Sequence, residues 1–232
     1  MNATSAQPLL QVHDLSVRFG AKEVVRNVSF EIAPGEKLAL VGESGSGKTI
    51  TALSLLRLAG DAVVRGRAVF EGRDLLALTE REMRGVRGGD IAMIFQEPMT
   101  ALNPLMTVGR QISEVLELKQ ALTQAQSWQA AIELIASTGI PEPERRATAF
   151  PHQVSGGQRQ RAMIAMALAS RPKLLLADEP TTALDVTLRG QILELLSELQ
   201  RQTGMAVLLI THDLNLVRRF ADRVAVMEQG VL

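Results

Sequence analysis

A glycine-rich segment, residues 42–49, carries the clearest chemistry in this sequence. It reads GESGSGKT and matches the pattern G-x-x-x-x-G-K-[ST], directly after a short apolar run and before a helical pattern. Glycines let backbone N–H groups turn inward around phosphate oxygens, and the following helix presents the positive end of its dipole. In such a loop Lys48 would reach the β- and γ-phosphates, and the Thr49 hydroxyl would bind Mg²⁺. The segment therefore predicts a site for a nucleoside triphosphate with Mg²⁺.

Two carboxylates, Asp178 and Glu179, follow another apolar run, residues 173–177. An acidic pair at the end of a strand is by itself more often part of a solvated loop. In a parallel sheet, however, the carboxyl ends of the strands meet at the edge where a phosphate loop also lies. There Asp178 would hold Mg²⁺, directly or through water, and Glu179 would orient and polarise the attacking water. Together with the glycine-rich segment, the pair predicts hydrolysis of the nucleotide.

A second anion-binding corner is predicted at residues 155–158, which read SGGQ and precede a helical pattern. Exposed backbone N–H groups, the Ser155 hydroxyl and the helix dipole would all favour an anion there. Ser and Gly also serve well as ordinary N-caps, so a purely structural role is the alternative. Because one nucleotide does not need two such corners, we expect this one to serve a nucleotide held by a second subunit.

The elements that must position these residues follow from hydrophobic periodicity. Alternating residues 12–19 and 28–32 predict half-buried antiparallel strands. Buried strands are expected over the apolar runs 37–41, 91–95 and 173–177, further strands over residues 205–210 and 223–227, and an edge strand over residues 67–70. Helices are expected over residues 49–58, 188–202 and 214–221. Strands that alternate with helices indicate a parallel sheet covered on both faces.

The segment between the two nucleotide motifs has a different character. From residue 108 to residue 139 apolar residues recur at helical spacing, and a last helix is expected between Gly157 and Pro172. We therefore expect an α/β fold. Residues 1–96 and 171–232 would form a nucleotide-binding core with a mostly parallel sheet, helices on both faces and an antiparallel β-subdomain. Residues 97–170 would form an inserted α-helical subdomain.

Composition excludes several classes of function. The chain has 232 residues, and its 25 Lys plus Arg balance 25 Asp plus Glu. Zero net charge and 3% aromatic residues argue against a nucleic-acid partner. The absence of cysteine excludes disulfides, thiol catalysis and cysteine-ligated metals within these residues. No stretch is apolar enough to span a bilayer and the first ten residues do not resemble a signal peptide, so the cytosol is the expected location.

The order of these motifs resembles the ATP-binding-cassette (ABC) ATPase family over essentially the whole chain. VSGGQ, residues 154–158, is similar to the family signature, which usually begins with Leu rather than Val. The resemblance implies that Gln96 contacts Mg²⁺ and the attacking water, and that His212 contacts the γ-phosphate. It also implies that Asp185 lies across a dimer interface and that Phe19 stacks on adenine.

The resemblance assigns roles to a set of residues in this sequence. The implied nucleotide-binding residues are Phe19, Gly42, Glu43, Ser44, Gly45, Ser46, Gly47, Lys48, Thr49, Thr51, Gln96, Ser155, Gly156, Gly157, Gln158, Asp185 and His212. The implied Mg²⁺ ligands are Thr49, Gln96 and Asp178, and the implied catalytic residues are Lys48, Gln96, Glu179 and His212. The cofactors are therefore expected to be ATP and Mg²⁺.

Two stretches, residues 96–104 (QEPMTALNP) and residues 177–193, resemble the branch that takes up oligopeptides, dipeptides and nickel. Two more stretches are similar to the N-terminal half of fused two-cassette ATPases of the microcin C and oligopeptide importer group. They are residues 85–98 (GVRGGDIAMIFQEP) and residues 163–172 (MIAMALASRP). The resemblance implies a second cassette bound head to tail, transmembrane permease subunits and an extracytoplasmic solute-binding protein, on the cytoplasmic face of the membrane. Because members of this branch usually continue past Leu232, we expect one cassette of a longer protein.

Four apolar residues after Gln96 are candidates for contact with the cytoplasmic coupling helices of the permease. They are Met99, Leu102, Leu105 and Met106, and ordinary core packing is the alternative for each.

Three other functions are alternatives to transport. A soluble ABC ATPase of DNA repair or translation would usually carry long coiled coils, zinc modules or a second cassette, and none is evident in this sequence. A catalytically idle cassette is disfavoured because five residues are intact: Lys48, Gln96, Asp178, Glu179 and His212. A GTPase is disfavoured because no N-K-x-D-type motif follows residue 178.

Overall fold

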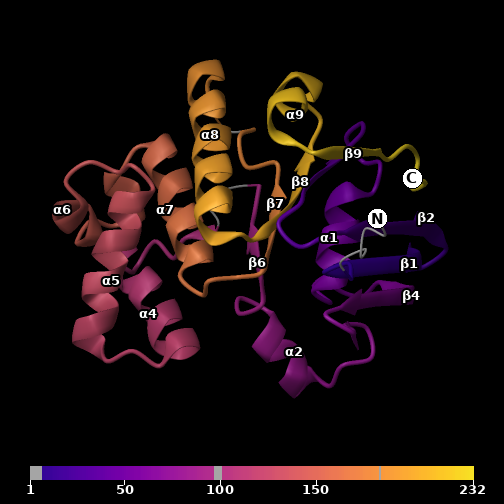
Figure 1. Cartoon of the computed structure of the whole chain (residues 1–232), viewed down its shortest axis with the longest axis horizontal. Coiled ribbons are helices and arrows are strands. Elements are labelled where there is room, and N and C mark those ends of the chain that lie inside the picture. The colour runs from indigo at the N-terminus through magenta and orange to yellow at the C-terminus, as the bar shows by residue number, and fades with distance from the viewer. Residues whose placement is uncertain (1–6, 97–100, 183) are drawn as a thin grey trace, which may run out of the picture. The chain divides into compact units, whose positions relative to one another are not determined.

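The computed structural model describes residues 7–96, 101–182 and 184–232 (Figure 1). Internal contacts divide the chain into two compact units: residues 1–87 with 200–232, called the first unit below, and residues 88–199, called the second unit. This division differs from the expected domain boundaries, because residues 88–96 and 171–199 fall with the helical segment. The domain boundaries expected from the sequence describe subdomains rather than contact groups, and they stay a prediction.

The first unit contains an antiparallel sheet with the strand order β2-β1-β4-β5. Its strands are β1 (Leu10–Phe19), β2 (Lys22–Ile32), β4 (Val63–Phe70) and β5 (Arg73–Asp74). β1 pairs with β2 from Leu10 opposite Ile32 to Phe19 opposite Lys22. Val12, Leu15 and Val17 are buried, and the alternation of buried and exposed residues changes phase where the register of β1 shifts between Val12 and Leu15. The expected antiparallel strands are confirmed.

The first unit also contains parallel strands. β3 (Lys37–Val41) lies between β8 (Ala206–Thr211) and β9 (Arg223–Val226), with Leu38 opposite Leu208 on one side and Arg223 on the other. All of β8 and residues 38–41 of β3 are buried, which explains why both strands are continuous apolar runs. The helices α1 (Lys48–Leu55) and α9 (Leu214–Phe220) follow β3 and β8.

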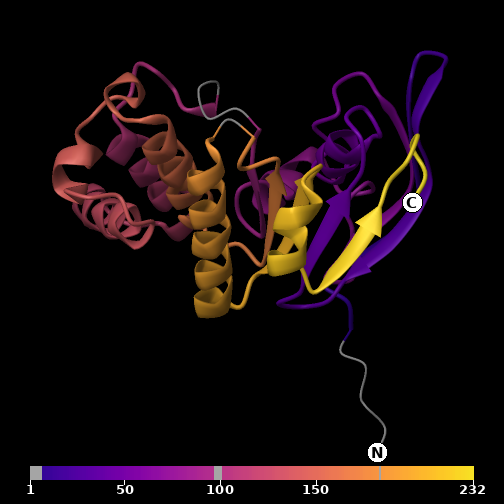
Figure 2. The ribbon, with the colours of Figure 1, turned by 90° about the horizontal axis from the view of Figure 1, so that it is seen from above.

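The chain after β9 returns along β2, as Figure 2 shows for the C-terminal end. The Arg26 N–H donates to the Gly230 carbonyl at 2.7 Å, and the Gly230 N–H donates to the Ser46 carbonyl at 3.0 Å. Residues close to the C-terminus therefore support the loop between β3 and α1.

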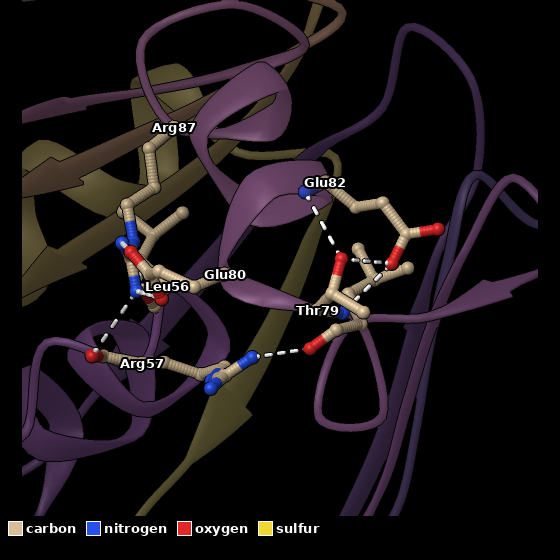
Figure 3. A network of polar contacts seen from close by, with 7 residues as sticks. Leu56, Arg57, Thr79, Glu80, Glu82 and Arg87 are labelled. Carbon is tan, nitrogen blue, oxygen red and sulfur yellow. Dashed lines mark hydrogen bonds and ion pairs between the residues drawn. The ribbon is translucent and has the colours of Figure 1, made fainter.

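One short helix, α2 (Glu80–Val86), was not expected from the sequence. It begins with a capping box, in which the Thr79 N–H donates to Glu82 Oε2 at 2.7 Å and the Glu82 N–H donates to Thr79 Oγ1 at 3.3 Å (Figure 3). Arg57 Nη1 donates to the Leu78 carbonyl at 2.6 Å, and Arg87 Nε donates to the Leu56 carbonyl at 2.6 Å. These bonds tie α2 to the end of α1.

The second unit joins a parallel strand pair to a group of helices. The strands are β6 (Ile91–Ile94) and β7 (Leu174–Asp178), with Ile91 opposite Leu174. The helices are α4 (Val108–Gln120), α5 (Gln124–Ser137), α6 (Pro143–Ala147), α7 (Gly156–Leu168) and α8 (Val186–Thr203), which begins in this unit. α4, α5 and α7 pack against one another around an apolar cluster that includes Ile112, Leu116 and Ile135 (Figure 1). Among the described residues, no helix is long and apolar enough to cross a membrane.

Candidate functional site

The loop between β3 and α1 is folded around the side chain of Lys48. Lys48 Nζ donates to the carbonyls of Gly42 and Glu43, each at 2.8 Å, and to Ser46 Oγ at 3.3 Å. The Lys48 residue is only 4% exposed. A cation held inside a glycine-rich loop at the start of a helix is suited to bind the phosphates of a nucleotide placed against the loop.

Two glycines of this loop occupy places that no other residue fits. Gly42 has φ +155°, and a Cβ atom there would lie 2.0 Å from the Met227 carbonyl oxygen. Gly47 has φ +105°, and its Cβ would lie 2.7 Å from the Val24 carbonyl oxygen. Positive φ angles and this close approach of backbone both require glycine. The shape of the loop is therefore fixed by strands distant in the sequence.

The other predicted residues of the loop differ in exposure. Glu43, Ser44 and Gly45 are exposed, Thr49 is half-buried, and Ser46 is 5% exposed. Thr51 is fully buried, and its hydroxyl donates to the Gly47 carbonyl at 2.9 Å. That bond gives Thr51 a structural role in the first turns of α1, and its predicted contact with the nucleotide stays a prediction.

Two further predicted residues belong to the first unit. Val41 lies opposite Thr211 in the parallel pair of β3 and β8, so the phosphate loop and His212 leave the sheet at the same edge on neighbouring strands. His212 is exposed. Phe19 is the last residue of β1 and is 36% exposed, which leaves its ring accessible for stacking on a base.

The second unit brings Gln96 and Glu179 together. Ile94 lies opposite Ala177 in the parallel pair of β6 and β7, so Gln96 and Glu179 follow neighbouring strands at one edge. Gln96 Nε2 donates to Glu179 Oε2 at 3.4 Å. Asp178 is the last residue of β7 and is 3% exposed, whereas Glu179 is half-buried.

Thr182 was missed by the sequence reasoning. Its hydroxyl donates to Glu179 Oε2 at 2.7 Å, and its backbone N–H donates to the Glu179 carbonyl at 3.2 Å. The only signal in the sequence is a spacing of three residues, which suits a turn but does not reveal where the threonine side chain points.

The SGGQ segment forms the start of α7. Ser155 is the N-cap, its hydroxyl accepts from the Gln158 N–H at 3.3 Å, and Gln158 Oε1 accepts from the Ser155 N–H at 3.2 Å. This capping box fits the purely structural role of an ordinary N-cap, and it does not exclude the binding of an anion at the start of α7. Gly156 is exposed, and a Cβ there would meet nothing within 4 Å. Packing within the chain therefore does not require glycine at this position.

Asp185 has a capping contact of its own. Its Oδ1 accepts from the Leu188 N–H at 2.9 Å, at the start of α8, and the residue is exposed. The contact explains an aspartate there within a single chain, and the predicted role across a dimer interface stays a prediction.

The four candidates for contact with a permease are in different surroundings. Leu102 is 2% exposed and belongs to the apolar cluster of the second unit, which favours the core-packing alternative. Leu105 is 85% exposed and Met106 is half-buried, so both can contact a partner. Met99 lies outside the described residues.

The predicted metal ligands have the chemistry that Mg²⁺ requires. The Thr49 hydroxyl, the Gln96 amide oxygen and the Asp178 carboxylate are oxygen ligands of the kind that Mg²⁺ prefers. The residues lie in different units, with the phosphate loop, Phe19 and His212 in the first and the remaining candidates in the second.

Comparison with known proteins identifies the family. The ABC transporter family model matches residues 25–182. The peptidoglycan transport ATP-binding protein YejF of Agrobacterium fabrum is 60% identical over 99% of this chain and 43% of YejF. The oligopeptide transport ATP-binding protein OppD of Bacillus subtilis is 51% identical over 96% of this chain and 64% of OppD. The chain thus spans less than two thirds of the length of either relative.

A solved structure agrees with the fold. The ATP-binding cassette MJ0796, in a dimeric post-hydrolysis state bound to ADP and Pi, is 29% identical with a TM-score of 0.84 over 96% of each chain. This match confirms the expected α/β fold of ABC type, with parallel and antiparallel strands and added helices. Since the family model covers most of the chain and the fold agrees, the chain belongs to the ABC transporter family.

Proposed function

We propose that this chain is an ATP-binding and ATP-hydrolysing cassette that powers a transporter for peptides or peptide-like solutes. The observation that carries the proposal is the glycine-rich loop folded around the Lys48 ammonium at the start of α1. The Glu179 carboxylate, contacted by the Gln96 amide, supplies the second requirement, a base for water. Membership of the ABC transporter family supports both assignments.

In this proposal each group of residues has its own task in ATP hydrolysis. Lys48 and the backbone N–H groups of residues 42–49 bind the phosphates, and Phe19 stacks on the adenine. Thr49, Gln96 and Asp178 would hold Mg²⁺, which neutralises phosphate charge. Glu179 accepts the proton of the attacking water, and His212 donates to the γ-phosphate.

We further propose that two cassettes associate head to tail around ATP. Ser155, Gly156, Gly157 and Gln158 of one cassette would bind the γ-phosphate held by the loop of the other, with Asp185 at the interface. Because only the associated state contains the complete site, ATP has a higher affinity for it and shifts the equilibrium towards it. Hydrolysis removes the γ-phosphate and lets the cassettes separate. The dimeric structure of MJ0796 supports the association of two cassettes.

The names of the relatives support transport as the function. YejF, OppD and the dipeptide transport ATP-binding protein DppD of Bacillus subtilis are named as transport ATP-binding proteins. A Brucella abortus relative is named as a putative peptide import ATP-binding protein. By analogy the partners are a second cassette, transmembrane permease subunits and an extracytoplasmic solute-binding protein. The chain would then lie peripherally on the cytoplasmic face of the membrane.

A Glu179→Gln variant tests the assignment. It keeps the size of the side chain and loses the base, so we expect ATP binding close to that of the wild type and a kcat lower by about 100-fold or more. Glu133→Gln, an exposed change in α5, is the matched control and should hydrolyse ATP like the wild type. Wild-type phosphate release from the Glu179→Gln variant would overturn the role of Glu179.

A further inference from the structure

The turn after β7 holds Glu179 in an unusual backbone conformation. Glu179 has φ +44°, which is uncommon for any residue other than glycine. The Glu179 carbonyl accepts from the Thr182 N–H at 3.2 Å, so the backbone bond that closes this turn comes from Thr182. Residues kept in such conformations cluster at functional sites, where the surrounding contacts must stabilise them.

The side chain of Thr182 makes a second bond to the same glutamate. Thr182 Oγ1 donates to Glu179 Oε2 at 2.7 Å, the usual length of a hydroxyl–carboxylate bond. Gln96 Nε2 donates to this oxygen at 3.4 Å, close to the upper limit for a hydrogen bond. Both bonds have the same charged acceptor, and strong bonds to a charged acceptor are short. The shorter bond, from Thr182, is therefore the stronger of these two.

We propose that Thr182 is a positioning residue for Glu179 and holds its carboxylate in the orientation that receives the proton of water. The inference rests on the proposed function. A carboxylate can rotate about its side-chain bonds, and a bond to Oε2 removes much of that freedom. A general base must lie within hydrogen-bond reach of the proton that it accepts, and small displacements are costly.

Because Thr182 lies at the surface, substitutions can distinguish a positioning role from a packing role. Thr182 is exposed, so its hydroxyl can be removed without opening a cavity in the core. Valine has the same shape and keeps both the β-branch and the backbone N–H that closes the turn. Serine keeps the hydroxyl and loses only the methyl group. The two substitutions therefore divide hydrogen bonding from shape.

The test compares steady-state ATP hydrolysis by the wild type, Thr182→Val and Thr182→Ser. We expect Thr182→Val to lower kcat by about tenfold because the base is less well oriented, with KM for ATP within about twofold of the wild type. Thr182→Ser should retain kcat within about twofold, since its hydroxyl makes the same bond. Thr148→Val is the matched control: Thr148 is exposed, and its hydroxyl donates to the Arg145 carbonyl at 2.9 Å, within its own turn.

Several outcomes would overturn the inference. A kcat of Thr182→Val equal to that of the wild type would show that the hydroxyl does not position Glu179. An equal loss in Thr182→Ser would assign the effect to shape, and a rise in KM without a fall in kcat would assign it to binding. If the wild type hydrolyses ATP and Glu179→Gln does not, any of these results overturns this inference alone. If the wild type does not hydrolyse ATP, the proposed function fails together with it.

Discussion

Single residues of the phosphate loop are constrained by backbone that lies far away in the sequence. The Met227 carbonyl closes the space beside Gly42, and the Val24 carbonyl closes the space beside Gly47. The Gly230 N–H, which donates to the Ser46 carbonyl, adds a third constraint. The geometry of the loop therefore depends on β2 and on the segment after β9.

Gly42→Ala should damage both folding and nucleotide binding. Its Cβ would lie 2.0 Å from the Met227 carbonyl oxygen at a φ angle that alanine avoids, so the loop must move. We expect the free energy of unfolding to fall by about 1–3 kcal/mol or more and the affinity for ATP to fall by about tenfold or more. Chemical denaturation and titration with a fluorescent ATP analogue measure the two effects.

Gly85→Ala in α2 is the control for that experiment. A Cβ at Gly85 meets nothing within 4 Å, and alanine favours a helix over glycine by up to about 1 kcal/mol. Stability equal to or above that of the wild type is expected, with unchanged ATP affinity. Equal behaviour of the two variants would contradict the steric argument at Gly42.

The sequence predicts residue types at the site better than it predicts their contacts. Lys48, Asp178 and Glu179 were predicted because each follows a recognisable run at a fixed spacing. Thr182 was not predicted, because only the turn in three dimensions brings its hydroxyl to the carboxylate. Leu102 and Leu105 are the same residue type three positions apart. Leu102 nevertheless lies in the core, whereas Leu105 is 85% exposed.

At the scale of helices and strands, burial decided what the sequence could reveal. The strand β3 was predicted with its observed bounds because residues 38–41 are buried on both faces and form an unbroken apolar run. The helix α2 was not predicted because it buries only Met83 and Val86, and so has little apolar periodicity. Its start could have been found from the capping box at Thr79 and Glu82, which is visible as the pattern T-x-x-E.

The contact between α4 and α5 should be sensitive to acid. Arg110 Nη1 donates to Glu117 Oε1 at 2.7 Å, and Ser127 Oγ donates to the same oxygen at 2.9 Å. The Arg110 guanidinium, followed by the Ser127 hydroxyl, holds the pKa of Glu117 below its ordinary value of 4.5. Because the folded-state pKa is the lower one, this carboxylate stabilises the fold above about pH 4.5. The contribution is lost as the pH falls through the folded-state pKa.

Melting temperatures of the wild type and Glu117→Gln between pH 3.5 and 7 test this contact. The wild type should melt higher at neutral pH, and the difference should narrow below about pH 4.5. Glu133→Gln in α5, whose side chain accepts from the Gln129 amide, is measured alongside as the control for a carboxylate lost outside this contact. A difference for Glu117→Gln that stays constant down to pH 3.5 would refute the prediction.

At the scale of the whole molecule, the chain supplies two groups of candidate residues on two compact units. The fold class was predictable, because the alternation of strands and helices and the order of the motifs are both written in the sequence. The grouping of residues 88–96 and 171–199 with the helices was not predictable, since it depends on packing between segments distant in the sequence. The proposed association of two cassettes can be measured directly, as the mass of the particle in solution.

Light scattering of the Glu179→Gln variant measures whether ATP joins two cassettes. With ATP and Mg²⁺ we predict the mass of two chains, and without ATP the mass of one, 25.2 kDa. Adding Gly156→Glu should restore the mass of one chain even with ATP, because the new carboxylate repels the γ-phosphate while its Cβ meets nothing within 4 Å. A mass of one chain for Glu179→Gln at saturating ATP and Mg²⁺ would contradict the account.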